Sequence, residues 1–141
     1  MTLTTLADIR AARQRIAGAV HRTPTFSATS LGASLGIALE LKAELFQKTG
    51  SFKVRGVLNK LRQLPPDDIA RGFITLSAGN HGAALAWAAT GLGSRATVVM
   101  PAHAGPSKVE AVRRYGGEPV DRKSTRLNSS HGYQSRMPSS A

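Results

Sequence analysis

The sequence predicts an α/β protein with a parallel sheet, because strand and helix patterns alternate through its second half. Apolar runs at 73–76 and 96–100, and a shorter one at 118–120, are separated by helical patterns at 81–92 and 107–115. Such alternation is typical of parallel strands joined by right-handed helical crossovers. The chain has 141 residues, enough for one modest domain. The first strand is expected to be buried.

The first half of the chain is less regular. Its predicted elements are a helix at 5–19, a short helix at 27–35, a strand at 37–43 and a helix that ends before Pro65. Thr5 is a candidate N-cap for the first of these, and Gly36 a candidate terminator for the second. Asp67 and Asp68 can start one further turn, which Gly72 closes.

Composition excludes several classes of protein. There is no cysteine, so neither a disulfide framework nor a cysteine metal site is predicted, and no other metal site is. No apolar run approaches a membrane span and the N-terminus lacks a signal-peptide pattern, so a soluble cytoplasmic protein is expected. The net charge of +11 is scattered, and no aromatic residues alternate with it as a base-stacking platform requires. Nucleic-acid binding is therefore not expected.

The segment 47–56 centres on Lys53. Ser51 is positioned to cap a helix, and Phe52 is apolar enough to turn inward. Lys53 then falls in the first turn, where the helix dipole disfavours a cation, and partial burial would also favour the neutral amine. A neutral amine is the nucleophile that Schiff-base chemistry needs. From spacing alone, a solvated lysine at a helix start explains the pattern as well.

A second cluster, Ser77-Ala78-Gly79-Asn80-His81-Gly82, lies between a predicted strand and a helix. Ligands of parallel sheets collect at the carboxyl ends of strands, and helix N-termini present free N–H groups to anions. A substrate carboxylate would suit this loop. The alternative is an ordinary turn, in which Asn80 caps the helix and His81 is a surface residue.

These two sequence motifs resemble those of a known enzyme family. Ser-Phe-Lys-x-Arg-Gly, preceded by Glu-Leu-Phe-Gln-Lys-Thr-Gly, resembles the cofactor-lysine segment of fold-type II pyridoxal-phosphate enzymes, in the threonine/serine dehydratase and serine racemase branch. Ser-x-Gly-Asn-His-Gly resembles the substrate loop of that family. The resemblance implies the three-layer parallel-sheet fold of the tryptophan synthase β-like enzymes, here incomplete. The implied cofactor is pyridoxal 5′-phosphate.

The resemblance also assigns roles to residues. Lys53 would carry the cofactor and act as the catalytic base, and Phe52 would pack beside the cofactor ring. Asn80 would reach the ring hydroxyl. The residues that would surround the substrate carboxylate are Ser77, Gly79, Asn80 and His81.

The implied reaction is dehydration and deamination of L-threonine or L-serine to a 2-oxo acid and ammonia. Serine racemases of this type carry a second serine where this chain has Ala78, and alanine cannot transfer a proton, so the dehydratase is favoured. Serine racemase, and a dehydratase of another β-hydroxy amino acid, remain alternatives. Outside the enzymes, the alternative is a non-catalytic truncated protein. A full-length version is expected to be a homo-oligomer that acts on a small amino acid.

The resemblance covers residues 5–120 and lacks the glycine-rich phosphate-binding loop of the family. Residues 1–66 are interpreted as part of the large cofactor domain, and 67–120 as the start of the small one. Residues 121–141 resemble translated sequencing adapter and are interpreted as an artefactual, disordered tail. The fragment alone is expected to be inactive.

Overall fold

The computed structural model describes residues 3–121 of the chain. In order, the elements are α1 (Leu6–Arg15), β1 (Thr25–Ser27), α2 (Thr29–Leu35), β2 (Glu40–Lys42), the 3₁₀ helix η1 (Glu44–Phe46), α3 (Lys53–Leu61), α4 (Pro66–Arg71), β3 (Phe73–Leu76), α5 (Asn80–Gly91), β4 (Ala96–Met100), α6 (Pro106–Arg114) and β5 (Glu118–Asp121). Of the tail predicted at 121–141, Asp121 is instead the last residue of β5, in register with Met100, and residues 122–141 lie outside the described residues.

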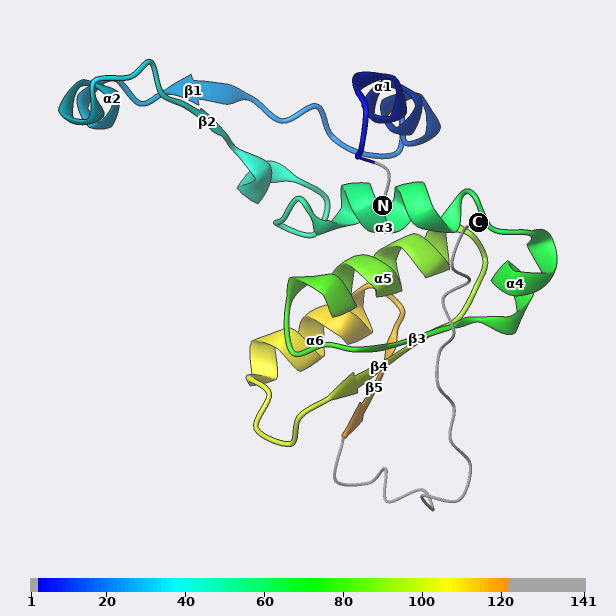
Figure 1. The fold of residues 1–141 in the computed structure, drawn as a ribbon. Helices are drawn as coiled ribbons and strands as arrows, with labels where there is room; N and C mark the ends of the chain where they lie inside the picture. The colour runs from blue at the N-terminus through cyan, green and yellow to red at the C-terminus, as the bar shows by residue number, and fades with distance from the viewer. Residues whose placement is uncertain (1–2, 122–141) are drawn as a thin grey trace.

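The three strands β3, β4 and β5 form a parallel sheet in that order, which confirms the parallel sheet predicted from the alternating pattern. Figure 1 shows α5 and α6 on one face of this sheet, with α3 packed on the far side of α5. The sheet, the α5–α6 layer and α3 together make up the body of the molecule, defined here as residues 53–121.

The core of the body lies between the sheet and its helices. Its largest fully buried side chains are Val54 of α3, Val98 of β4 and Val112 of α6. The alanine-rich helix α5 lies between α3 and the sheet, and its small side chains let it approach both of them closely. At Gly82 no side chain fits, because a Cβ there would lie 2.7 Å from Cγ1 of Val98. Small residues on α5 therefore set the spacing between helix and sheet.

The prediction that the first strand of the sheet is buried is wrong: Phe73 and Thr75 are half-buried, and the other two residues are exposed. Ile74 is 73% exposed and Leu76 is 66% exposed. Successive side chains of a strand point to opposite faces, and no described element covers the face on which these two lie. An apolar run predicts a strand buried on both faces, but the second face is covered only if another segment packs on it.

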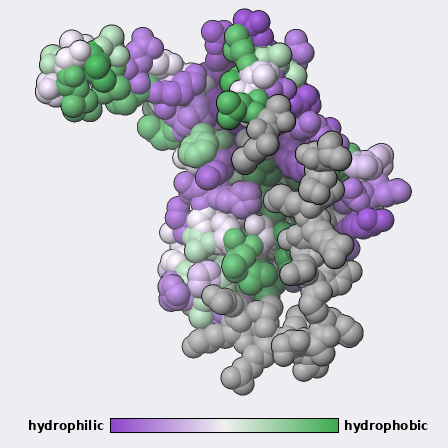
Figure 2. Space-filling model, viewed as in Figure 1, coloured by the Kyte–Doolittle hydropathy of each residue, from purple (hydrophilic) through white to green (hydrophobic). Residues whose placement is uncertain are grey.

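Residues 23–46 form an arm that projects from the body (Figure 1). Within it, β1 and β2 pair antiparallel, with Phe26 opposite Leu41, and α2 joins them at the tip. Every residue of both strands is exposed. Figure 2 shows hydrophobic residues on the surface of this arm.

Local signals near the N-terminus are confirmed, with shorter boundaries than the patterns suggest. Thr5 caps α1 in a capping box with Asp8. The helix then ends at Arg15 rather than at 19. Gly36 terminates α2 in the left-handed conformation, with φ of 66°. The strand predicted at 37–43 is limited to the three residues of β2.

Candidate active site

The N-termini of α3, α5 and α6 all lie at the end of the body where the parallel strands finish (Figure 1). This edge is where ligands of open parallel sheets bind, because loops there follow each strand and helix N-termini point toward it. Lys53 is the first residue of α3, and Asn80 the first residue of α5. The two clusters singled out in the sequence therefore belong to one end of the fold.

The structure corrects three expectations about the lysine segment. Ser51 does not cap α3: the N-cap is Phe52, without any side-chain hydrogen bond, and the Ser51 hydroxyl is buried with no hydrogen-bond partner. Phe52 does not turn inward but is 57% exposed. Lys53 is exposed as well, contrary to the partial burial expected for its amine, and its Nζ lies 4.9 Å from the centroid of the Phe52 ring. The helix turns inward from Val54 onward, which leaves its first residues at the surface.

An ion pair between Glu44, just before the lysine segment, and Arg55, near its end, holds this segment in place. Arg55 donates from Nε to Oε2 of Glu44 (2.8 Å) and from Nη2 to Oε1 (2.7 Å), a bidentate contact. The hydroxyl of Thr23 donates to the same carboxylate over 2.5 Å. The hydrogen bonds from Arg55, and then that from Thr23, lower the pKa of Glu44 to about 2, against the opposing effect of burial. Glu44 therefore stays ionised at neutral pH.

A buried glutamine adds a second restraint. The side-chain carbonyl of Gln47 accepts from the backbone N–H of His21 (2.9 Å), and its amide donates to the His21 carbonyl (2.9 Å). Together with the Glu44–Arg55 pair, these bonds tie the turn before Lys53 to the chain at 21–23. We call this set of contacts the clamp: His21, Thr23, Glu44, Gln47 and Arg55.

The loop from Ser77 to Gly82 is organised by the Ser77 hydroxyl. Its Oγ accepts from the backbone N–H of Gly79 (3.3 Å) and of Gly82 (3.1 Å). Since both acceptor positions are used by the loop, the hydroxyl hydrogen is available to donate outward. The amides of Asn80 and His81 belong to the first turn of α5, where no helical partner exists for them. This loop can therefore offer an anion one hydroxyl and two backbone donors.

Two contacts at this end of the fold were not anticipated from the sequence. Lys108 of α6 donates to Oδ1 of Asn80 over 3.1 Å, and the Tyr115 hydroxyl donates to the Lys48 carbonyl over 2.9 Å. The second contact joins residues 67 positions apart. Neither contact can be predicted from local sequence, because each depends on how α6 packs relative to α3 and α5.

The residues at this end fit a pyridoxal-type cofactor in their chemistry. Lys53 supplies an exposed amine and Phe52 an exposed aromatic face beside it. The N-terminus of α3 has no side-chain cap, and the buried hydroxyls of Thr49 and Ser51 have no partner. These two hydroxyls beside the candidate lysine are thus free to bind a polar group of such a cofactor.

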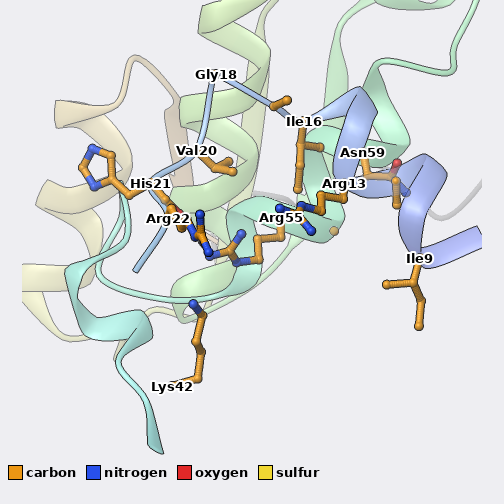
Figure 3. Close-up of a pocket in the computed structure, with 13 residues that line it drawn as sticks. Ile9, Arg13, Ile16, Gly18, Val20, His21, Arg22, Lys42, Arg55 and Asn59 are labelled. Atoms are coloured by element: carbon orange, nitrogen blue, oxygen red, sulfur yellow. Dashed lines mark hydrogen bonds between the residues drawn. The ribbon is translucent and has the colours of Figure 1, made fainter. Parts of the chain in front are cut away.

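A separate cavity of about 640 Å³ lies between α1, the turn at 16–22 and α3. Its lining combines apolar residues with basic ones, as Figure 3 shows for Ile9, Ile16, Val20, Arg13, Arg22 and Arg55. Neither Lys53 nor any residue of the 77–82 loop lines it. We therefore do not identify this cavity with the candidate active site.

Comparison with known proteins gives the same family as the sequence motifs around Lys53 and Ser77. The family described as "Pyridoxal-phosphate dependent enzyme" matches residues 16–133, and the chain belongs to this family. A serine racemase of Oryza sativa subsp. indica is 48% identical over 110 residues, which are 78% of this chain and 32% of the relative. A putative threonine dehydratase of Sinorhizobium fredii is 47% identical over 111 residues, or 79% of this chain and 33% of the relative.

A solved structure gives the same picture. Maize serine racemase superposes with a TM-score of 0.78 at 44% identity, over 85% of this chain and 36% of the other. This confirms the fold-type II assignment and the pyridoxal-phosphate cofactor of the family. The chain spans about a third of the length of the relatives it matches. Within the described residues, no helix has both the length and the apolar character that crossing a bilayer requires.

Proposed function

We propose that the enzyme represented by this chain dehydrates and deaminates L-threonine or L-serine, giving a 2-oxo acid and ammonia. The observation that carries the proposal is the placement of Lys53 and the Ser77–Gly82 loop at the same end of the fold, with an alanine at position 78. Both racemases and dehydratases are among the similar proteins, so the choice between them rests on Ala78.

Each residue has a role that its surroundings support. When bound, pyridoxal phosphate supplies an electron sink for the charge left on the substrate's α-carbon. Lys53 would hold the cofactor through its amine, and the free amine would remove the α-proton as a general base. The Ser77 hydroxyl and the amides of Asn80 and His81 bind the substrate carboxylate, and Gly79 allows its close approach. Phe52 would pack against the cofactor ring, and Asn80 would bind its ring hydroxyl.

Ala78 decides between elimination and racemisation. Racemisation needs one proton-transferring group on each face of the α-carbon, whereas elimination needs one face only. Ala78 is exposed in the loop and carries no proton to transfer. In a full-length version, Ala78→Ser should raise racemisation of serine relative to elimination, measured by chiral separation. An unchanged ratio would contradict the argument that a single proton-transferring face limits this enzyme to elimination.

The role of Lys53 is tested in a full-length version with a matched lysine control. Lys53→Ala should abolish 2-oxo acid formation from L-threonine and the absorbance of covalently held cofactor. Lys60→Ala, at the exposed other end of α3, should change neither. Turnover that persists in Lys53→Ala would overturn the proposal.

The 141-residue chain by itself is proposed to bind the cofactor weakly and to show no turnover, because the glycine-rich phosphate loop of the family is not in it. Steady 2-oxo acid production by this chain, lost in Lys53→Ala, would contradict this. Three further features stay predictions. They are a domain boundary after residue 66, a cytoplasmic location and a homo-oligomeric full-length enzyme.

A further inference from the structure

The contact between Lys108 and Asn80 joins two helices at the end of the fold that carries the candidate active site. The ammonium of Lys108 donates to Oδ1 of Asn80 over 3.1 Å, and both residues are exposed. Within the described residues, neither side chain makes another hydrogen bond or an ion pair. The contact is therefore isolated, and no larger network explains why it forms.

The place of Lys108 is set by the packing of α6 against α5. Lys108 and Val112 are four residues apart, so they lie on the same face of α6. Val112 is completely buried in the core of the body. Beyond it, Thr90 of α5 donates to the carbonyl of Tyr115, which follows α6, over 3.0 Å. Because α6 is fixed along this face, its first turn presents Lys108 to the start of α5.

The charge of Lys108 stands where the helix dipole disfavours it. Lys108 is in the first turn of α6, and the first turns of α5 and α6 both lack an acidic residue. A cation at a helix N-terminus is unfavourable, and no carboxylate of the described residues forms an ion pair with this one. Local arrangements that cost stability are expected at functional sites.

Lys108 also fixes which way the amide of Asn80 faces. An ammonium has three donors and no acceptor, so it binds Oδ1 and leaves Nδ2 on the other side. The side chain of Asn80 is not used as a helix cap, because the N-cap of α5 is Gly79 and no side-chain cap bond is formed. Among the described residues Nδ2 has no partner. The amide nitrogen can therefore donate to a ligand.

We propose that Lys108 is a positioning residue that acts through Asn80 to keep the ring hydroxyl of the cofactor ionised. The inference rests on the proposed function, in which Asn80 binds that hydroxyl. An ammonium on Oδ1 draws electron density from the amide and strengthens Nδ2 as a donor. A hydrogen bond donated to an ionised oxygen stabilises the ionised form. Lys108 itself contacts neither the cofactor nor the substrate in this assignment.

The contact can be tested in the 141-residue chain without any cofactor. In nuclear magnetic resonance spectra, Lys108→Met should move the side-chain amide signals of Asn80, because the ammonium is removed from Oδ1. Lys108→Arg keeps a cationic donor and should move them less. Arg114→Met removes the same charge at the other end of α6 and should leave them in place. Asn80 signals that stay in place in Lys108→Met would overturn the proposal.

The effect on the ring hydroxyl is read from the absorption spectrum of the full-length enzyme with bound pyridoxal phosphate. At one fixed pH, Lys108→Met should lower the ratio of the ionised to the protonated hydroxyl band by about threefold. Lys108→Arg should restore most of the ratio. In an Asn80→Ala background, Lys108→Met should leave the ratio nearly unchanged, because Lys108 then has no amide to act through. An equal change in both backgrounds would show a direct effect of the charge and overturn the proposal.

Failure of this inference can be distinguished from failure of the proposed function. If the full-length enzyme has no cofactor band that depends on Lys53, the proposed function fails and this inference fails with it. If the cofactor is held by Lys53 and Lys108→Met has an unaltered ratio, only this inference fails. A lowered ratio in an enzyme that does not dehydrate threonine or serine would support the inference and show that the proposed reaction is wrong.

Discussion

The body and the arm both contain regular helices and strands, yet they differ in how these elements are held. In the body, α3, α5, α6 and the sheet share one hydrophobic core, and Val54, Val98 and Val112 are completely buried. In the arm, both strands are exposed throughout, and Phe26 and Leu41, in register across the ribbon, are about half exposed. Secondary structure in the arm thus has no core beneath it.

The clamp is the connection between these two regions. Glu44 and Thr23 belong to the arm, and Arg55 belongs to α3 of the body. The comparison shows that the body is stabilised by apolar burial, whereas the arm is joined to it by a few charged and polar contacts. Changes in the two regions should therefore differ in size and in their dependence on pH.

The largest expected effect is the loss of the core of the body. Val98→Asp buries a carboxylate with no partner and should cost at least about 4 kcal/mol, enough to unfold a domain of this size. Chemical denaturation followed by circular dichroism measures it. Phe26→Asp in the arm is the matched control and should change the unfolding free energy by less than about 1 kcal/mol. Equal losses in the two variants would show that arm and body unfold as one unit.

Acid should separate the arm from the body. Because the folded pKa of Glu44 is lowered from 4.5 to about 2, its contribution is complete above pH 4.5 and is lost as the pH falls toward 2. The loss is on the order of 2 kcal/mol, given partial solvent screening at Arg55. Limited proteolysis of the arm between pH 5 and pH 2 (using an acid-active protease) reports it. Glu44→Gln should be cleaved readily at all these values, and a pH-independent wild type would contradict the prediction.

The close approach of α5 to the sheet can be tested with two glycines. Gly82→Ala places a Cβ 2.7 Å from Val98 and should destabilise the body by about 1–2 kcal/mol. Gly56→Ala, on α3 with open space around it, should stabilise by about 0.5–1 kcal/mol through helix propensity. Thermal unfolding measures both. Equal shifts in the same direction would mean that propensity, and not packing, decides the outcome at Gly82.

The smallest effect is expected for the apolar residues of the arm. Leu41→Thr keeps a residue that favours strands at an exposed position in register with Phe26, so it should change the unfolding free energy by about 0.5 kcal/mol or less. Denaturant titration would detect a larger change. A loss above about 2 kcal/mol would show that the arm packs against a surface in solution, as a core residue does.

Much of the architecture follows from local patterns. The strands at 73–76 and 96–100, the glycine that ends α2 and the cap at Thr5 were all predicted at their observed positions, because each depends on neighbours within a few residues. The parallel arrangement followed from alternation and crossover handedness. The family followed from the two strings around Lys53 and Ser77.

The sequence by itself therefore determined the elements, the class of fold and the family of the cofactor, since these are encoded in short spacings and local chemistry. Only the tertiary structure decided that Ser51 is buried without a partner, that Phe52 is exposed, and that Lys108 reaches Asn80. It also decided that one face of β3 is open. Exposure and long-range contacts depend on which distant segments pack together, and no local spacing records that.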